Sequence, residues 1–346
     1  MDIYEPAGDT VQLRPLIVIA HGGSFIGGTK TDYDVSTLCN TFTKMGYVCA
    51  SVEYRLGFFP IDSVNAIKAV LRATQDMKAA VRWFRQDATG ANTYKIHPNY
   101  IFVAGSSAGA FMALHSQYMD ASEFPLGITT LNSLGGIDGT SGNPGFSSAA
   151  LAVVNLCGAL GDSSYLQPGD VPLCSMHGDI DGIVPFGSTT IQIIGVPIMQ
   201  VDGSSSIKVR ADNIGVFNPF FPWWGADHVP YAANNAVGYA YMDTTVQFVK
   251  TFLRPFLGTP TGINLPGTNL NSISIFPNPA NTFFNLSVAD ENVVVTITSS
   301  EGKIVLNKIL DNGKNKIDIS NFVTGIYFGK VKYKDGSAKV FKVVKE

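Results

Sequence analysis

The sequence has little charge, few cysteines and no long hydrophobic run, and each shortage excludes a class of protein. Of its 346 residues, 15% are charged and 45% are hydrophobic, a balance that excludes general disorder and permits a sizeable core. The net charge of −3 argues against a nucleic-acid binder, which would normally carry a basic surface. No run of about 18 apolar residues occurs, so no transmembrane segment is expected.

The cysteines are Cys39, Cys49, Cys157 and Cys174. None belongs to a CxxC pair, which argues against a zinc site. Two disulfides and four buried thiols both remain open, because pairing cannot be read from spacing. Met1 is followed at once by "DIYEPAGD", which has neither a charged n-region nor an apolar h-region. No signal peptide is therefore expected in this chain.

Residues 1–256 alternate between strand-like and helix-like segments. Continuous apolar runs occur at 15–20, 47–55, 100–105, 151–157 and 171–178. Helical patterns are expected at 63–86, 107–119, 206–216 and 236–256. Uninterrupted apolar strands that alternate with helices indicate a doubly wound, mostly parallel α/β sheet covered on both faces.

The composition of the sequence changes after residue 256. Residues 257–272 carry no charge and are rich in Gly, Pro, Asn and Thr, which is a linker composition. Residues 273–346 contain short alternating strands and turns such as "KDG", which predict a small all-β sandwich. Formal charges of −6 for 1–256 and +3 for 273–346 support two separate domains.

The stretch "GSSAG" at 105–109 follows the apolar run "YIFVA" and opens a helix. A serine hydroxyl becomes a nucleophile only when a base takes its proton and donors stabilise the resulting oxyanion. The G-x-S-x-G pattern holds such a serine at a sharp strand-to-helix turn. It fits this stretch in one frame only, so Ser107 is the expected nucleophile and Ser106 its variable neighbour.

The stretch "HGGSF" at 21–25 directly follows the apolar run at 15–20. A turn of small residues there exposes backbone N–H groups that can face the nucleophile. We expect the oxyanion hole to be formed by the N–H groups of Gly23, Ser24 and Ala108. The two motifs occur in the expected order, with one βα unit between them.

The acid and the histidine should follow the serine in that order. Of the five histidines, only His228 comes after a further strand-like run, in "FFPWWGADHVPY". For the acid, "HGDIDGIVP" offers Asp179 and Asp181, both just past a strand end. We favour Asp181, with Asp179 as the alternative that braces the loop, whereas Asp227 should point away.

With these motifs in place, residues 1–256 resemble an α/β-hydrolase-fold serine esterase of the carboxylesterase and feruloyl- or acetyl-esterase-like kind. The matching pieces are "HGGSFIGG", "YRLG", "GSSAG", "HGDIDGIVPFG" and "GADHVPY". The family pattern H-G-x-x-D-x-x-V-P implies that Asp181 is the acid. This chain departs from the family pattern in two ways. Ser24 replaces the third glycine of the usual H-G-G-G loop. Two strands usually precede the strand expected at 15–20, whereas here only "MDIYEP" does.

Residues 273–346 resemble the type A sorting domain that directs Bacteroidetes proteins to type IX secretion. The features are "ISIFPNPA", "SSEGKIV", "IDISNFVTGIYFGKV" and the terminal "KVFKVVKE". The resemblance implies an interaction with the type IX secretion machinery and a secreted or cell-surface location. Export through an oxidising compartment favours disulfides. A generic carbohydrate-binding or adhesive β-sandwich is the alternative.

The expected function is hydrolysis of a carboxylic ester through Ser107, His228 and Asp181, with no metal or cofactor required. Phe25, Ser106, Trp223 and Trp224 are candidate substrate-binding residues, although the aromatic residues before His228 could instead pack the last strand. Residues 120–150 are loop-rich and are considered as a cover for the site. Acetyl, feruloyl, lipid and polyester substrates stay open, as do a peptidase on the same fold and a non-catalytic adhesin.

Overall fold

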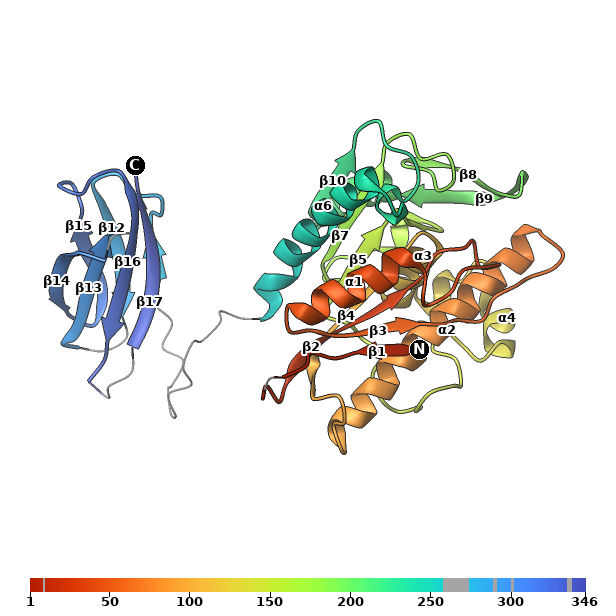
Figure 1. The fold of residues 1–346 in the computed structure, drawn as a ribbon, viewed down its shortest axis with the longest axis horizontal. Coiled ribbons are helices and arrows are strands. Elements are labelled where there is room, and N and C mark those ends of the chain that lie inside the picture. The colour runs from red at the N-terminus through yellow and green to blue at the C-terminus, as the bar shows by residue number, and fades with distance from the viewer. Residues whose placement is uncertain (9, 258–273, 289–290, 300–301, 335–337) are drawn as a thin grey trace. The chain divides into compact units, whose positions relative to one another are not determined.

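The structure is a computed structural model that describes residues 1–8, 10–257, 274–288, 291–299, 302–334 and 338–346. The chain divides into two compact units, residues 1–259 and 260–346 (Figure 1). All but Leu257 of the predicted linker 257–272 lies outside the described residues. Within the described residues, no helix has both the length and the apolar character needed to cross a membrane.

Unit 1 is built on a seven-stranded sheet in the order β1-β3-β2-β4-β5-β7-β10. The strands are β1 (Asp2–Tyr4), β2 (Arg14–Ala20), β3 (Val48–Val52), β4 (Ile96–Ser106), β5 (Ala152–Leu156), β7 (Leu173–Gly178) and β10 (Phe220–Trp223). Only β1 runs antiparallel to its neighbour; the other strands pair in parallel. The predicted mostly parallel α/β sheet is confirmed, and one short strand precedes β2.

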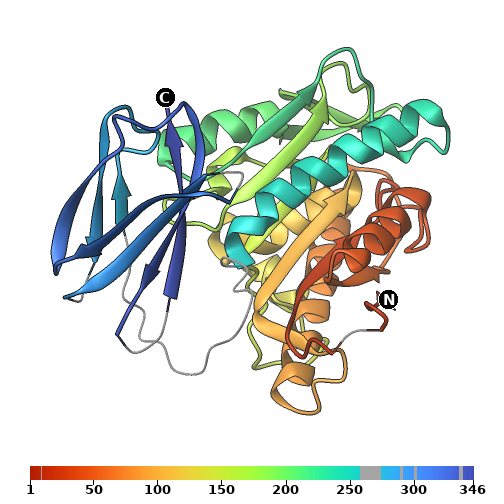
Figure 2. The ribbon, with the colours of Figure 1, turned by 60° about the vertical axis from the view of Figure 1, so that its left-hand side comes forward.

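Helices cover both faces of this sheet (Figure 2). The helices are α1 (Tyr33–Lys44), α2 (Ser63–Thr89), α3 (Ala108–Tyr118), α4 (Gly127–Ser133), α5 (Ser204–Ile214) and α6 (Ala236–Leu253). Helices α1 and α6 lie on one face, and α2 and α3 lie on the other (Figure 1).

Alternation along β2 shows why both faces must be covered. Leu16 and Val18 join the core under α2 and α3, whereas Ile17 and Ile19 join the core under α1 and α6. A strand that is apolar on both sides can be buried only between two helical layers. The four cysteines lie in the core under α1 and α6 as buried free thiols. Of the two alternatives left open by the sequence, the structure therefore has four thiols. The disulfides that export would favour are absent.

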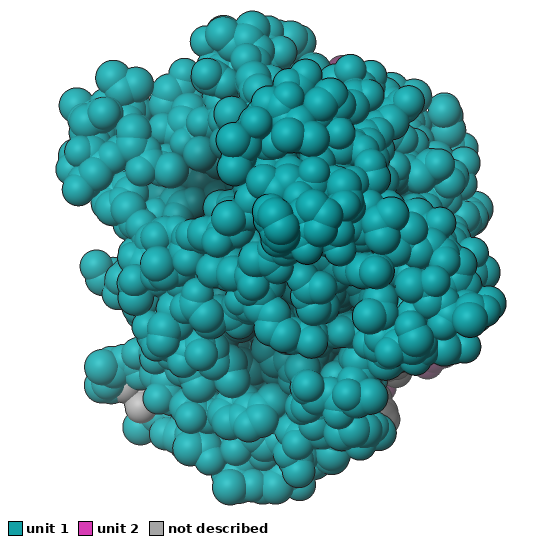
Figure 3. Space-filling model, turned by 90° about the vertical axis from the view of Figure 1, so that its right-hand side faces the viewer, with its two compact units in different colours: residues 1–259 teal, residues 260–346 magenta. Residues whose placement is uncertain are grey.

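A second, smaller sheet of unit 1 stands beside the main one. It contains β6 (Ala159–Leu160), β8 (Ser188–Ile193) and β9 (Val196–Gly203) in the antiparallel order β6-β9-β8. Strands β8 and β9 form a hairpin whose tip projects at the right-hand side of Figure 1. Figure 3 views unit 1 from that side and shows an uneven, hollowed surface.

Unit 2 contains two antiparallel sheets. One has the order β11-β12-β15 and the other β14-β13-β16-β17. The strands are β11 (Ser274–Phe276), β12 (Phe283–Val288), β13 (Val293–Ser299), β14 (Ile304–Leu310), β15 (Gly313–Asp318), β16 (Gly325–Lys332) and β17 (Ala338–Lys345). Every second residue of β12, including Phe284 and Leu286, is buried in one core shared with β13 and β16. This arrangement agrees with the small all-β domain predicted for 273–346.

Candidate active site

Ser107 occupies a sharp turn between β4 and α3. Its backbone has φ of +55°, a left-handed conformation that is uncommon for a residue with a Cβ. The loop after β2 passes directly over it, since a Cβ on Gly22 would lie 3.2 Å from the Ser107 Cβ and 3.8 Å from its Oγ. The strained turn therefore holds the Ser107 hydroxyl at the carboxyl end of the sheet, beside the loop formed by 21–25.

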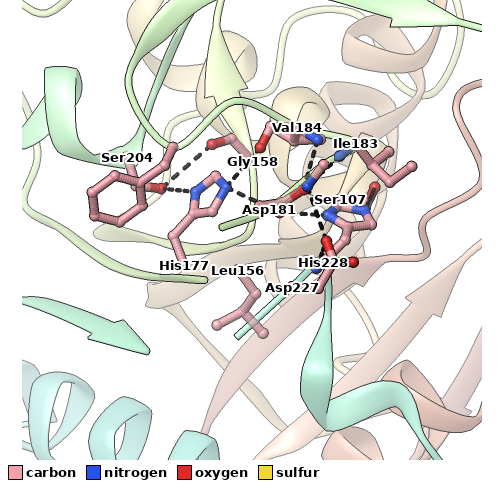
Figure 4. Close-up of polar contacts among 12 residues, drawn as sticks. Ser107, Leu156, Gly158, His177, Asp181, Ile183, Val184, Ser204, Asp227 and His228 are labelled. Carbon is pink, nitrogen blue, oxygen red and sulfur yellow. Dashed lines mark hydrogen bonds and ion pairs between the residues drawn. The ribbon is translucent and has the colours of Figure 1, made fainter. Parts of the chain in front are cut away.

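A chain of hydrogen bonds connects three side chains that are far apart in the sequence (Figure 4). Ser107 Oγ lies 2.8 Å from His228 Nε2, and His228 Nδ1 lies 2.6 Å from Asp181 Oδ2. A carboxylate can only accept, so Nδ1 carries the proton and Nε2 of the neutral ring accepts from the Ser107 hydroxyl. The structure thus brings together the three residues that the sequence predicted for this role.

The Asp181 carboxylate has hydrogen-bond partners in addition to His228. Its Oδ1 accepts from the N–H groups of Ile183 (2.9 Å) and Val184 (2.8 Å), and its Oδ2 accepts from His177 Nε2 (3.1 Å). Burial raises the pKa of Asp181, but the hydrogen bonds from His177 and His228 lower it more, so this pKa lies well below its ordinary value. Asp181 is therefore ionised at neutral pH and fixed in orientation.

His177 is a member of the site that the sequence interpretation missed. It is the fifth residue of β7 and fully buried, and its Nδ1 lies 2.7 Å from Ser204 Oγ at the start of α5 (Figure 4). Its Nε2 faces two acceptors, the Asp181 carboxylate and the Val184 carbonyl (3.1 Å), so this nitrogen carries a proton and donates to them. The signal in the sequence was the i, i+4 spacing of His177 and Asp181 in "HGDID", which sets both residues at one strand end.

The other two acidic residues near the site bond to backbone groups. Asp179 accepts from the N–H of Gly225, and Asp227 accepts from the N–H groups of Gly182 (2.9 Å) and His228 (2.7 Å). Both carboxylates therefore tie together the loops that follow β7 and β10. These are bracing contacts, which agrees with the secondary role given to Asp179 and the outward direction given to Asp227.

The loop with the expected oxyanion donors has its own support. Tyr54 donates its hydroxyl to the carbonyl of His21 (3.0 Å), lies 3.1 Å from that of Gly22, and stacks on the His21 ring at 4.4 Å. Gly23 and Ser24 both have positive φ, of +111° and +53°. The loop is thus fixed in a left-handed turn, and Ser24 and Ala108 both line the pocket beside Ser107.

Two of the candidate substrate-binding residues lie elsewhere. Ser106 is buried and bonds to the Tyr231 hydroxyl at 2.8 Å, because neighbouring residues of a strand point to opposite faces. Trp223 is 5% exposed and packs against Tyr231 and Tyr241 under α6. The prediction that Ser106 and Trp223 contact substrate is therefore wrong, and the alternative that the aromatic side chains pack the last strand describes Trp223.

Trp224 and Phe25 differ from those two residues. Trp224 is 74% exposed and lies near Phe186, outside the residues that line the pocket beside Ser107. Phe25 does line that pocket and meets Phe111 edge-on at 6.3 Å. Of the four candidates, Phe25 alone therefore reaches the pocket.

The walls of this pocket come from segments that the sequence interpretation did not single out. They are formed mainly by the β8–β9 hairpin, including Ile193 and Met199, and by the start of α3. No residue of 120–150, all of which the structure describes, lines the pocket. That segment is bound to α2 instead, through Lys78 and Asp138 (2.8 Å) and through Arg82 and the Gly142 carbonyl (2.8 Å). The hairpin therefore lines this pocket in its place, while Phe124 and Pro125 of 120–150 line a neighbouring cavity.

One cluster of metal-ligand atoms exists at the site. Potential ligand atoms of Cys157, Asp181 and His228 lie within 4.8 Å of one another. Burial raises the pKa of Cys157 to about 12, so its thiol is protonated at neutral pH. A metal ligand would have to be the thiolate, and Asp181 and His228 already bond to each other. These residues do not fit a resident metal.

Comparison with known proteins gives two separate family matches. Residues 1–133 match the BD-FAE family, and residues 274–346 match the secretion system C-terminal sorting domain. The chain is 32% identical to carboxylesterase 3B of Mus musculus over 117 residues, and 34% identical to carboxylesterase 3 of Pongo abelii over 111 residues. Each alignment covers 32% of this chain but only 19% and 18% of those relatives. The chain thus matches about a fifth of their length.

Solved structures share the fold of unit 1. A thermophilic esterase of Thermogutta terrifontis with propionate bound aligns with a TM-score of 0.54 and 22% identity, over 75% of this chain and 90% of that chain. A second structure of this enzyme, esterase 2, phosphorylated by paraoxon, aligns with a TM-score of 0.54 and 22% identity, over 73% of this chain and 87% of that chain. The resemblances drawn from the sequence are confirmed: unit 1 has the α/β-hydrolase fold of these esterases, and residues 274–346 are a secretion system C-terminal sorting domain, the mark of a secreted or cell-surface protein.

Proposed function

We propose that unit 1 is a serine hydrolase that cleaves carboxylic esters. The observation that carries this proposal is the hydrogen-bonded chain from Ser107 Oγ through His228 to Asp181, with Ser107 held in a left-handed turn. Such a chain activates a hydroxyl that is otherwise a weak nucleophile. The esterase neighbours of the same fold, one of them phosphorylated by paraoxon, support the same chemistry.

In the first step, Ser107 Oγ attacks the ester carbonyl carbon while His228 Nε2 takes the hydroxyl proton. The negative charge that develops on the carbonyl oxygen is stabilised by the N–H groups of Gly23, Ser24 and Ala108. The bond to the alkoxy oxygen then breaks, and His228 returns the proton to that oxygen. The products of this step are an alcohol and an acyl group on Ser107.

In the second step, water attacks the acyl carbon and gives its proton to His228 Nε2. The bond to Ser107 Oγ breaks, the proton returns to Oγ, and the carboxylic acid leaves. Asp181 stays ionised throughout and stabilises the imidazolium of His228, which agrees with the lowered pKa of Asp181. No step requires a metal or cofactor.

The sorting domain supports a function outside the cytoplasm, with residues 273–346 as the part recognised by the type IX secretion machinery. The ester is then one that the protein meets at the cell surface or in the medium.

The proposal is tested with the purified full chain on p-nitrophenyl acetate and on a peptide p-nitroanilide. We expect release of nitrophenol, none of nitroaniline, and complete loss of activity after stoichiometric modification of Ser107 by paraoxon, located by mass spectrometry. Cleavage of the anilide at a comparable rate would favour a peptidase. Absence of cleavage of both, in folded protein, would favour the non-catalytic adhesin.

A further inference from the structure

A pocket of about 60 Å³ opens beside Ser107. It is lined by Ser24, Ser107 and Ala108 and otherwise almost entirely by apolar side chains, while His228 lies outside its lining. In the proposed reaction the leaving alkoxy group must lie next to His228, which protonates it. The pocket is therefore on the side of the acyl group.

A second cavity of about 40 Å³ lies behind the first. The two cavities share the side chains of Val70 from α2, Phe111 from α3, and Met199 and Val201 from β9. Those four side chains lie between the two cavities. The cavity beside Ser107 is called the outer cavity, and the second one is called the inner cavity. Met199 is unbranched and flexible, so its side chain is suited to move aside for a ligand.

The lining of the inner cavity is mainly apolar, and its polar side chains are Tyr165 and His115. His115 lines it, but its Nδ1 is bonded to the Phe111 carbonyl (2.8 Å) and its Nε2 accepts from the Gly161 N–H (3.1 Å). Burial lowers the pKa of His115 to about 4, so the ring is neutral at pH 7. A ligand hydroxyl placed here would lose its water without gaining a partner from this histidine.

The volume of the outer cavity also limits which acyl groups can bind there. An apolar cavity of about 150 Å³ holds a benzene ring in another protein, whereas the outer cavity here is about 60 Å³. A linear acyl chain can enter such a space and continue past Met199, but an aromatic ring needs the walls to part.

We propose that the acyl group of the substrate is an unbranched aliphatic chain that fills the outer cavity and passes between Phe111 and Met199 into the inner one. This inference rests on the proposed ester hydrolysis and narrows its substrate class: saturated acyl esters are preferred to acetyl esters and to aromatic acyl esters such as feruloyl or benzoyl.

The test measures kcat/KM of the full chain on p-nitrophenyl acetate, butanoate, hexanoate, octanoate and benzoate, each divided by its rate of alkaline hydrolysis. The leaving group is constant, so only the acyl side varies. We expect a rise of about four-fold per methylene group to butanoate, the equivalent of about 0.8 kcal/mol per group. Benzoate should be at least ten-fold below hexanoate.

Three variants locate the preference. Met199→Ala joins the two cavities and should move the best chain length up by at least two carbons. Val70→Phe narrows the passage and should reduce hexanoate at least ten-fold more than acetate. Ile194→Ala is the matched control, because Ile194 is at the tip of the same hairpin, 78% exposed and outside both cavities; its profile should equal that of the unchanged chain.

The outcomes separate the two proposals. Hydrolysis with benzoate equal to or above hexanoate would overturn the acyl-chain inference and leave the ester hydrolase standing. So would an unchanged chain-length profile in both Met199→Ala and the larger Met199→Phe, each shown by circular dichroism to be folded. No hydrolysis of any ester by folded protein would overturn both.

Discussion

Ser106 and Ser107 are adjacent in the chain, but their side chains have different neighbours. Ser107 bonds to His228, whereas Ser106 bonds to Tyr231 in the core under α6. This difference follows from the strand-to-helix turn, which directs the two hydroxyls to opposite sides. The G-x-S-x-G frame therefore predicts which hydroxyl lies beside His228, but it does not reveal the partner of the other one.

Alanine substitution should separate the two serines. Ser107→Ala should reduce kcat on p-nitrophenyl butanoate by roughly 10⁵-fold or more, because no other group replaces the nucleophile. Ser106→Ala should keep activity within a few-fold and lower the free energy of unfolding by about 1 kcal/mol through the lost Tyr231 bond. A dead Ser106 variant beside an active Ser107 variant would contradict the assignment.

The two aspartates after β7 should differ in the same assay. Asp181→Asn leaves a group that can donate to Nδ1, which mis-sets the tautomer of His228, so kcat should fall by about 10³–10⁴-fold. Asp179→Asn removes a charge but keeps an oxygen that can accept from the Gly225 N–H, so it should cost less than about ten-fold. The ranking is read from kcat with KM measured in parallel, and the reverse order would move the acid to Asp179.

The lowered pKa of Asp181 also predicts a pH dependence of stability. A group whose pKa is lower in the folded than in the unfolded chain stabilises the fold at pH values above its ordinary pKa, near 3.9, and this stabilisation is lost as the pH falls further. Unfolding in urea, followed by tryptophan fluorescence, should therefore show Asp181→Asn less stable than the unchanged chain by about 1–3 kcal/mol at pH 7. The gap should shrink at pH 3. A constant gap would mean that ionisation of Asp181 contributes nothing.

Residue types and order predicted Ser107, Asp181 and His228, because chemistry restricts which side chains can fill those roles. They did not predict His177, Trp223 or Ser106 correctly. The reason is that the direction of a side chain at a strand end depends on the twist of the sheet and on the packing of the next helix. "PWWG" allows either tryptophan to face the site, and only the fold shows that Trp223 packs on Tyr231 and Tyr241.

Among the secondary-structure elements, β4 and α3 require unusually close backbone packing against β2. A Cβ added to Gly109, in the first turn of α3, would lie 2.1 Å from the Ala20 carbonyl oxygen and 2.7 Å from that of His21. Distances below 3.0 Å between such atoms cannot be tolerated, and the obstacle here is backbone that cannot rotate away. The glycine that ends the motif thus lets the helix that carries Ser107 approach the strand that leads to the oxyanion loop.

Gly109→Ala should consequently separate α3 from β2. We expect a loss of about 3 kcal/mol or more in the free energy of unfolding, since overpacking of 1–3 kcal/mol is here added to a backbone clash. Residual activity per folded molecule should fall as well, because Ser107 and the loop move apart. Gly187→Ala is the control: its φ is not positive, its Cβ would meet nothing closer than the Ser205 Oγ at 3.6 Å, and its stability should be unchanged within about 0.5 kcal/mol. Equal stability of both variants would contradict the close-packing argument.

The elements with continuous apolar runs were predictable, whereas the β8–β9 hairpin was not. Strands β2, β3, β5 and β7 are buried on both faces, so their sequences are mainly apolar and do not alternate with exposed polar residues. The hairpin is exposed along β8 and only partly buried along β9, and its pocket side is recognisable only from what it covers. This explains why the residues at the carboxyl edge of the sheet were predicted from sequence while the walls of the pocket beside Ser107 were not.

At the scale of the whole molecule, the two units differ in both architecture and charge. Unit 1 is a parallel α/β sheet with two helical layers, and unit 2 has antiparallel sheets with a core of its own. Each core is made of residues from its own unit, which is what independent folding requires. The composition of the sequence alone indicated this division, because linker-type residues need no structural context to be recognised.

Unit 2 should be dispensable for the folding and the esterase activity of unit 1. Every group assigned to the reaction, the pocket and the last helix α6 precede Leu257, and among the described residues the core of unit 1 includes none beyond it. A chain that ends at Leu257 should therefore fold, with tryptophan fluorescence and urea midpoint close to those of the full chain, since Trp83, Trp223 and Trp224 all lie in unit 1. Its kcat on small esters should stay within a few-fold. What it should lose is export in a host with type IX secretion, measured as activity in the medium against activity retained in cells. A truncated chain that is folded but inactive would assign part of the active site to unit 2, and one that is still exported would remove the sorting role from residues 274–346.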